Sequence, residues 1–181
     1  QNGALLTDLD VFENVAFPLR EHARLPERLV RSIVLTKLHA VGLRGAARLR
    51  PQQLSGGMAR RVGLARAIAL DPMLIIYDEP FAGLDPISCN VVGNLIRKLN
   101  DALGATSIVV SYDAAESMRV IDHVYLMSEG VISASGPAAE MAGSLDPFVH
   151  QFLRGEPDGP VPFHYVHKPY ADDLGLQGRA A

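Results

Sequence analysis

The sequence predicts an α/β fold organised around a parallel β-sheet. Residues 74–77 and 106–110 are short apolar runs, which are typical of strands buried on both faces of such a sheet. A helix-length segment lies between them, with Pro86 suited to its first turn and Gly104 to its C-terminal cap. Because strands and helices alternate along this part of the chain, we expect an α/β layer architecture.

Three helices are expected before the first strand. Asp10 and Glu13 form a capping-box-like pair that begins a short helix, which Pro18 interrupts or ends. Apolar residues recur at helical spacing over residues 27–41 and predict a second helix. The third helix is expected over residues 55–70, where an Asp-Pro pair ends it.

Shorter elements are expected after the second strand. Asp113 and Glu116 form another capping pair, which predicts a helix that ends near Val120. Residues 123–134 have the pattern of a hairpin with an intervening Glu-Gly turn, and two short helices follow near 137–142 and 147–153.

We therefore divide the chain into a partial domain, residues 1–154, and an extended tail, residues 155–181. Within the domain we expect a helical subdomain over about 4–70 and the remainder of the sheet core over about 71–154. The tail is rich in proline, with scattered aromatic residues, and it lacks the apolar periodicity that would build a core of its own.

Composition excludes several classes of protein. The 181 residues are 48% hydrophobic, which excludes disorder throughout, and a net charge of −3 argues against a nucleic-acid partner. Cys89 is the single cysteine, so no internal disulfide can form. No apolar run reaches about 18 residues, so we expect no direct membrane insertion. The chain begins at Gln1 within sequence that reads as ordered, and we expect it to be a fragment.

Two groups of residues carry candidate chemistry. Ser55 can cap a helix whose first residues, Gly56 and Gly57, let backbone N–H groups approach a phosphate; an ordinary capped helix is the alternative. Asp78 and Glu79 follow the first strand at the edge where open α/β sheets bind ligands. Asp78 is placed to hold Mg²⁺ and Glu79 to polarise an attacking water, although a solvent-exposed acid pair would look the same.

Three sequence motifs in fixed order produce a specific resemblance. LSGGM at residues 54–58, LIIYDEP at 74–80 and GLDP at 83–86 resemble the signature, Walker B and D-loop motifs of the nucleotide-binding subunits of ABC transporters. The resemblance implies a partial ABC-type P-loop NTPase fold, in which a helical subdomain accompanies the C-terminal part of the sheet core. It also implies ATPase activity with ATP and Mg²⁺ as cofactors.

The resemblance assigns roles to individual residues. Glu79 would be the catalytic carboxylate, Asp78 would hold Mg²⁺, and Gln1 would be the Q-loop glutamine, with both catalytic and magnesium contacts. Tyr112 stands where the family carries a switch histidine. Tyrosine can donate a hydrogen bond but is a poor proton carrier near neutral pH, so either impaired turnover or a tolerated substitution follows.

The resemblance also implies that the site is shared between two subunits. Ser55, Gly56 and Gly57 would contact ATP held by the opposite protomer, and Asp85 would contribute from the D-loop. A P-loop of the form GxxxxGK[ST] is absent from the 181 residues, so we expect this fragment alone to be inactive.

Further stretches resemble one branch of the family. The segments NVAFPLREH at 14–22 and DGPVPF at 158–163 are similar to the ATPase of Mla-type phospholipid transporters. This implies a homodimer bound to transmembrane permease subunits at the cytoplasmic face of a bacterial inner membrane. Two alternatives remain: the ATPase of another ABC importer, or a soluble ABC-type protein that acts on chromosomes or ribosomes.

Overall fold

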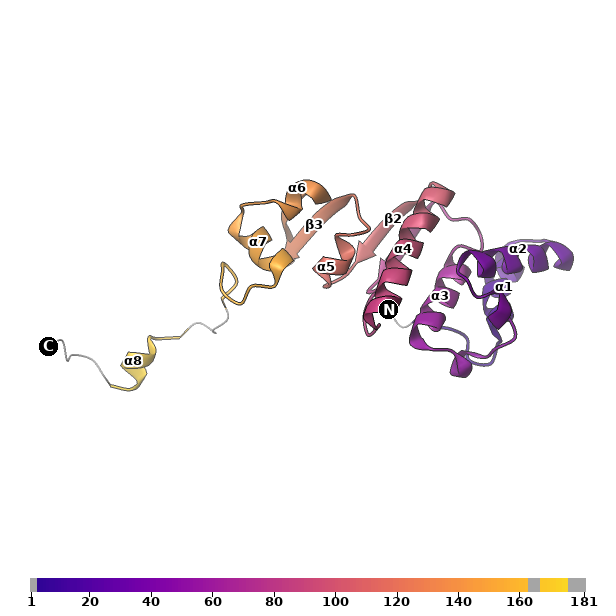
Figure 1. The fold of residues 1–181 in the computed structure, drawn as a ribbon, viewed down its shortest axis with the longest axis horizontal. Helices are drawn as coiled ribbons and strands as arrows, with labels where there is room; N and C mark the ends of the chain where they lie inside the picture. The colour runs from indigo at the N-terminus through magenta and orange to yellow at the C-terminus, as the bar shows by residue number, and fades with distance from the viewer. Residues whose placement is uncertain (1–2, 163–166, 176–181) are drawn as a thin grey trace. The chain divides into compact units, whose positions relative to one another are not determined.

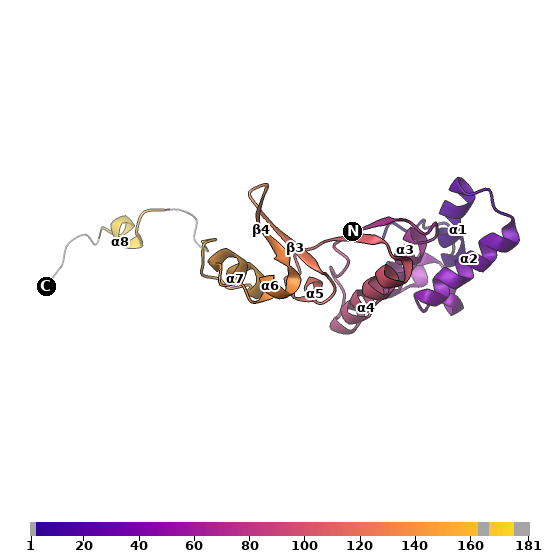
Figure 2. The same ribbon diagram turned by 90° about the horizontal axis from the view of Figure 1, so that it is seen from above.

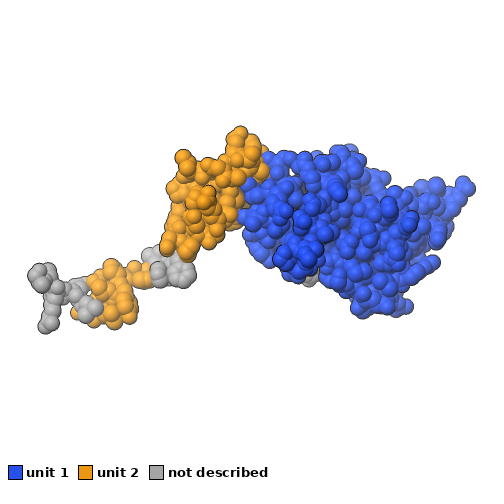
Figure 3. All heavy atoms as spheres, viewed as in Figure 1, with its two compact units in different colours: residues 1–122 blue, residues 123–181 orange. Residues whose placement is uncertain are grey.

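A computed structural model describes residues 3–162 and 167–175. The chain divides into two compact units, Gln1–Asp122 and His123–Ala181, which Figure 3 shows in different colours. The expected division separates a helical subdomain (residues 4–70), a sheet core (71–154) and a tail (155–181). It is not based on contacts within the chain, as the two units are, and it stays a prediction.

Three helices and two short 3₁₀ turns form the first part of unit 1 (Figure 1). The helices are α1 (Val11–His22), α2 (Glu27–Ala40) and α3 (Gly56–Ala67), and the turns are η1 (Arg44–Ala46) and η2 (Pro51–Gln53). The Asp10 side chain caps α1 by accepting a hydrogen bond of 2.8 Å from the Glu13 N–H, as its sequence predicts. The third helix ends at Ala67, three residues earlier than expected.

The expectation that Pro18 interrupts or ends the first helix is wrong. Helix α1 continues through Pro18 to His22. Proline removes one backbone donor, but Val15 and Leu19 on either side of it are almost fully buried. Packing of this apolar face holds the helix together across the missing hydrogen bond.

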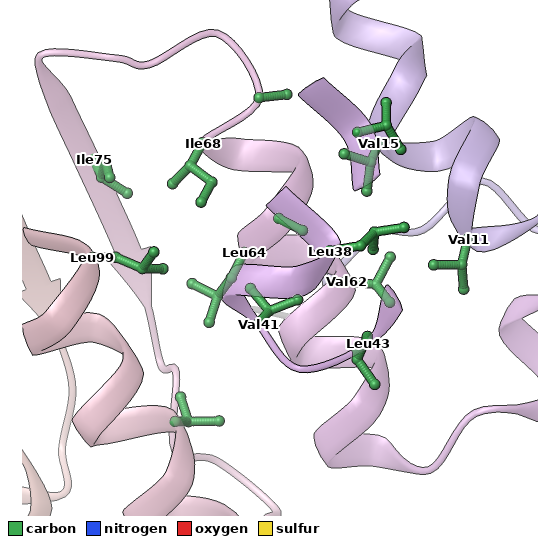
Figure 4. Close-up of a cluster of buried hydrophobic side chains, with 14 of the residues drawn as sticks. Val11, Val15, Leu38, Val41, Leu43, Val62, Leu64, Ile68, Ile75 and Leu99 are labelled. Atoms are coloured by element: carbon green, nitrogen blue, oxygen red, sulfur yellow. The ribbon is translucent and has the colours of Figure 1, made fainter. Parts of the chain in front are cut away.

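The helices enclose a common hydrophobic core. Figure 4 shows buried side chains from all three helices pointing toward one another. Val15 of α1, Leu38 of α2 and Val62 of α3 are each fully buried. Because the apolar faces pack on one another, tertiary contacts stabilise helices that would be marginal alone.

Two parallel strands, β1 (Leu74–Asp78) and β2 (Thr106–Val110), complete the framework of unit 1 with helix α4 (Pro86–Leu103). Helix α4 lies on one side of the strand pair (Figure 2), and its buried residues belong to the same core as Ile75 and Tyr77. Short helix α5 (Ala114–Ser117) follows β2 and ends three residues before Val120.

In these 181 residues the strands are not buried on both faces, as the sequence expectation had them. Leu74 and Ile76 are 49% and 63% exposed, and Ile108 and Val110 are 47% and 51% exposed. These four side chains alternate with the covered ones, as the period of a strand requires. Helix α4 covers one face of the pair, while the other presents apolar side chains to solvent.

Unit 2 begins with an antiparallel hairpin of β3 (His123–Ser128) and β4 (Val131–Pro137). Helices α6 (Ala138–Ala142), α7 (Pro147–Arg154) and α8 (Tyr170–Asp173) follow. Buried Gln151 of α7 donates to the Glu156 and Val161 carbonyl oxygens and accepts from the Val161 N–H at 2.9 Å. Residues 156–161, which belong to the expected extended tail, are thus hydrogen-bonded to α7 through Gln151. The helical turn α8 also lies within the expected tail.

Candidate functional site

The first candidate cluster lies where β1 ends. Asp78 is the last residue of the strand, and the Glu79 N–H donates to the Val110 carbonyl oxygen at 2.8 Å. Glu79 has a φ of +46°, a left-handed conformation that is uncommon for a residue with a side chain. The chain therefore turns sharply at Glu79 while its backbone stays bonded to β2. Unusual backbone conformations of this kind are frequent at functional sites.

The Glu79 carboxylate accepts two hydrogen bonds from the segment that follows β2. The Ser111 Oγ donates to Glu79 Oε2 at 3.1 Å, and the Tyr112 N–H donates to Glu79 Oε1 at 3.0 Å. Ser111 Oγ in turn accepts from the Asp113 N–H at 3.1 Å. These bonds fix the carboxylate at the edge shared by both strands. We call Asp78, Glu79, Ser111 and Tyr112 the strand-end cluster.

The Tyr112 side chain contributes nothing to this contact with Glu79. It is 70% exposed, and the donor is its backbone N–H. The hydrogen bond would therefore be available to any residue except proline at position 112. The sequence interpretation considered only the side chain at this position, so it did not find the backbone contact.

The second candidate cluster lies at the start of α3. Ser55 caps the helix by accepting a hydrogen bond of 3.3 Å from the Met58 N–H. The first N–H groups of a helix have no partner within it, and Ser55 and Gly56 are exposed to solvent. Backbone donors at a helix N-terminus suit an anionic ligand, and the expected contact of Ser55, Gly56 and Gly57 with nucleotide stays a prediction.

The start of α3 packs beside the turn that precedes α4. Arg60 Nη2 donates to the Ala82 carbonyl oxygen at 2.9 Å. A Cβ atom built on Gly57 would lie 2.9 Å from Ser88 Oγ, whereas one built on Gly56 would lie 4.0 Å from Leu84 Cδ2. A side chain at position 57 would therefore displace Ser88, whereas one at position 56 would make only an ordinary contact. We call Ser55–Gly57 with Leu84–Ser88 the signature–turn contact.

Asp85 is held tightly within this contact. One carboxylate oxygen accepts from the N–H groups of Ile87 and Ser88, each at 3.0 Å, and the other accepts from Ser88 Oγ at 2.6 Å. The Ser88 hydroxyl and these backbone donors lower the pKa of the Asp85 carboxyl, because they stabilise its charged form. The carboxylate both begins α4 and fixes the preceding turn.

The described residues contain no group of three or more histidine, cysteine or acidic side chains that could hold a metal ion. Cys89 is buried, and burial raises the pKa of its thiol, which disfavours the reactive thiolate. Among the same residues, no helix is both long and apolar enough to cross a membrane. Gln1 lies outside the described residues, so its expected role stays a prediction.

Sequence reasoning located the backbone positions of the site but missed some supporting side chains. Ser111, Ser88 and Arg60 make the contacts that orient Glu79, Asp85 and the 82–88 turn. Ser111 had a detectable signal, since it directly follows the strand next to β1. Ser88 also had one, since it lies three residues after Asp85 at the start of the helix. Arg60 had none, because its bond to the Ala82 carbonyl oxygen depends on how α3 packs beside the turn before α4.

Comparisons with known proteins give a consistent picture. The ABC transporter family matches residues 1–82. The intermembrane phospholipid transport system ATP-binding protein MlaF of Haemophilus influenzae is 56% identical over 96% of this chain and 66% of its own length. Its Escherichia coli K12 counterpart is 55% identical over 96% and 65%. The probable ribonucleotide transport ATP-binding protein mkl of Mycobacterium leprae is 39% identical over 89% and 46%.

Solved structures agree with the fold. The ATP-binding cassette MJ0796, a dimer in a post-hydrolysis state bound to ADP and Pi, has a TM-score of 0.68 at 30% identity, covering 76% of this chain and 60% of its own. The cbiO1 protein of Clostridium perfringens, part of the ABC transporter complex cbiONQ, has a TM-score of 0.72 at 28% identity, covering 83% and 59%. The chain spans about two thirds of the length of the MlaF relatives. It belongs to the family of ABC transporter ATP-binding subunits.

Proposed function

We propose that the protein binds and hydrolyses ATP as the nucleotide-binding subunit of a transporter that moves phospholipids between the membranes of a bacterial envelope. The observation that carries this proposal is the 55–56% identity to MlaF proteins over 96% of the chain. Identity to the ribonucleotide-transport relative is 39% over 89%. The phospholipid branch is therefore favoured over another importer branch.

The strand-end cluster supports the hydrolytic part of the proposal. The Glu79 carboxylate is oriented by Ser111 and by the Tyr112 N–H, at the edge where α/β sheets bind ligands. A carboxylate in such a place can accept a hydrogen bond from water and align it for attack on a phosphoryl group. Glu79 would act on nucleotide held by a P-loop, which these 181 residues do not contain.

Magnesium fits this arrangement through Asp78. A Mg²⁺ ion in a nucleotide site is usually held by one or two carboxylates together with substrate phosphates and water. Asp78 is exposed at the end of β1 and offers one such carboxylate, and Gln1 is the second proposed protein ligand. The ion, when bound, would neutralise charge on the phosphates.

The exposed start of α3 is suited to a site shared by two copies of the protein. Ser55, Gly56 and Gly57 expose a helix N-terminus that suits the triphosphate of a nucleotide held by the opposite protomer. Asp85 would face the same dimer interface. We propose a homodimer that binds permease subunits at the cytoplasmic face of the inner membrane, where nucleotide state shifts the population between closed and open dimers.

A single substitution tests the hydrolytic role. In the full-length protein, Glu79→Gln keeps the shape of the side chain but removes its charge. We expect ATP hydrolysis to fall by about 10²-fold or more, while ATP still drives dimer formation, since removing a positioned base costs about 10²–10⁴-fold. Steady-state hydrolysis and size-exclusion chromatography with ATP measure the two effects. Glu140→Gln on α6 is the matched control.

Unchanged hydrolysis in Glu79→Gln would contradict the catalytic assignment. The phospholipid assignment is tested separately, by reconstituting the full-length protein with its permease in liposomes. We expect phospholipids to stimulate hydrolysis and nucleosides to leave it unchanged. Stimulation by nucleosides alone would instead assign the protein to another importer branch.

The switch position offers a second test. We expect Tyr112→His in the full-length protein to raise turnover, because histidine titrates in the useful range and tyrosine does not. The backbone bond from residue 112 to Glu79 is common to both variants, so the comparison isolates the side chain. Equal or lower turnover would show that tyrosine is tolerated at this position.

A further inference from the structure

Ser88 lies between two segments that the sequence motifs treat as separate. It belongs to the first turn of α4, and it contacts the Asp85 carboxylate on one side and Gly57 on the other. None of the motifs singled out from the sequence includes it. Its position makes the start of α4 a junction between the D-loop and the signature helix α3.

The contact with Asp85 is the stronger of the two. Ser88 donates to the carboxylate through its hydroxyl at 2.6 Å and through its backbone N–H at 3.0 Å. A hydrogen bond to a charged acceptor is both shorter and stronger than one between neutral groups. Without the hydroxyl, one carboxylate oxygen of Asp85 would lose this partner, and its χ angles would be less restricted.

The contact with Gly57 is steric. A Cβ atom at position 57 would lie 2.9 Å from Ser88 Oγ, closer than packed atoms come, and 3.3 Å from Ser88 Cβ, which is tighter than most packed contacts, so Ser88 would have to move. Ser88 therefore fills the space that the glycine leaves open. The adjacent Gly56 differs, since its built Cβ would meet only Leu84 Cδ2, at an ordinary 4.0 Å. The two glycines of the signature thus have different structural requirements.

We propose that Ser88 is a positioning residue that sets Asp85 of the D-loop against Gly57 of the signature helix within one subunit. This inference rests on the proposed function, in which both segments face nucleotide at a dimer interface. Because the two segments are held at a fixed spacing, they reach that interface together. Arg60 reinforces the spacing through its bond to the Ala82 carbonyl oxygen.

Hydrogen exchange of the full-length protein without nucleotide tests the geometry. We expect Ser88→Ala to increase amide exchange at residues 87 and 88 about threefold or more, because Asp85 holds those N–H groups less firmly. Ser88→Thr retains the hydroxyl and should restore protection. Gly57→Ala should also increase exchange there, whereas Gly56→Ala should not.

A double substitution separates the direct contact from a general loss of stability. In a Ser88→Gly background the clash partner is gone, so adding Gly57→Ala should not increase exchange further. An additional increase, or unchanged exchange in Ser88→Ala, would overturn the proposal. Equal effects of Gly56→Ala and Gly57→Ala would overturn it as well.

Steady-state kinetics distinguish a positioning role of Ser88 from a merely structural one, because they separate changes in kcat from changes in KM for ATP. We expect Ser88→Ala to lower kcat about 3- to 10-fold and to change KM for ATP less than about twofold. The reason is that the spacing between Asp85 and Gly57 matters in the assembled dimer and not when ATP first binds to one subunit. Ser88→Thr should recover most of the loss. A rise in KM with kcat unchanged would overturn the proposed role. If the wild-type protein does not hydrolyse ATP, the proposed function fails, but the exchange experiment still decides the role of Ser88.

Discussion

The helical and strand regions of unit 1 differ in how completely their apolar faces are covered. Helices α1, α2 and α3 pack their buried faces on one another, and Val15, Leu38 and Val62 are fully buried. The β1–β2 pair has one face against α4 and leaves Ile76 and Ile108 63% and 47% exposed on the other. Apolar periodicity therefore identifies an element and its apolar face, but it does not show whether that face is covered.

The largest expected effect tests the closed helical core. Leu38→Ala removes a fully buried side chain from α2, and we expect it to lower the free energy of unfolding by about 2–5 kcal/mol. Leu29→Ala in the same helix is the matched control, because Leu29 is 44% exposed. Urea unfolding followed by circular dichroism measures both. Equal losses would mean that the two ends of α2 are packed alike.

A buried polar residue provides the next test. Asn14 is fully buried; its Oδ1 accepts from the Leu6 N–H at 2.8 Å, and its Nδ2 donates to the carbonyl oxygens of Leu6, Leu9 and Asp10. Asn14→Ala removes the side chain that bonds the Leu6 N–H and the Leu9 carbonyl oxygen, whereas the Leu6 and Asp10 carbonyl oxygens still accept from backbone N–H groups. We expect a loss of about 1–3 kcal/mol.

The side chain of Asn14 fastens the segment before α1 to that helix. Hydrogen exchange should therefore rise at the Leu6 amide in Asn14→Ala. Asn94→Ala on α4 serves as a control, because the bond from its side chain to Asn90 Oδ1 is exposed to solvent. Unchanged exchange at Leu6 would show that other contacts hold the segment.

The exposed strand face should tolerate polar substitution. In the 181-residue chain, we expect Ile76→Thr with Ile108→Thr to change the free energy of unfolding by less than about 1 kcal/mol, since neither side chain is deeply buried. Self-association should decrease, because exposed apolar patches promote it. Sedimentation velocity measures association. A loss comparable to that of Leu38→Ala would show that this face is covered in solution.

The difference between the covered helical core and the uncovered strand face also explains which features the sequence could predict. Local signals were sufficient for the capped start of α1 at Asp10, for both strands and for α4. They failed at Pro18, because packing of Val15 and Leu19 outweighs a local helix-breaking signal. They also failed for Ile76, whose exposure depends on what lies opposite its face.

In the candidate site, too, the sequence predicts local features and misses contacts that depend on packing. Asp78, Glu79 and Ser55 could be placed from strand and helix ends, which are local features. The bond from Ser111 to Glu79 and the fit of Ser88 against Gly57 join residues 31 or more positions apart in the chain. Such contacts depend on strand register and helix packing. The sequence could indicate that Ser111 lies near Glu79, because both follow neighbouring strands, but no pattern in it indicates that Ser88 meets Gly57.

The smallest expected effect concerns an ion pair between two helices of the closed region. Arg20 of α1 bonds Glu27 of α2 at 2.6 Å, and it also pairs with Glu13. The hydrogen bond from Arg20 lowers the pKa of the Glu27 carboxyl. A lowered pKa in the folded state means that the pair stabilises the protein above the ordinary glutamate pKa and that this contribution is lost as pH falls through the folded value.

Glu27→Gln should therefore lower the thermal midpoint slightly at neutral pH and have no effect in acid, below the folded pKa of Glu27. Added salt should also remove the difference, because both side chains are partly exposed and salt screens exposed charges. Thermal unfolding of both proteins across pH and ionic strength measures this, with Glu21→Gln on α1 as the control. A difference that persists in acid would mean that Glu27 stabilises the helix pair through packing and not through its charge.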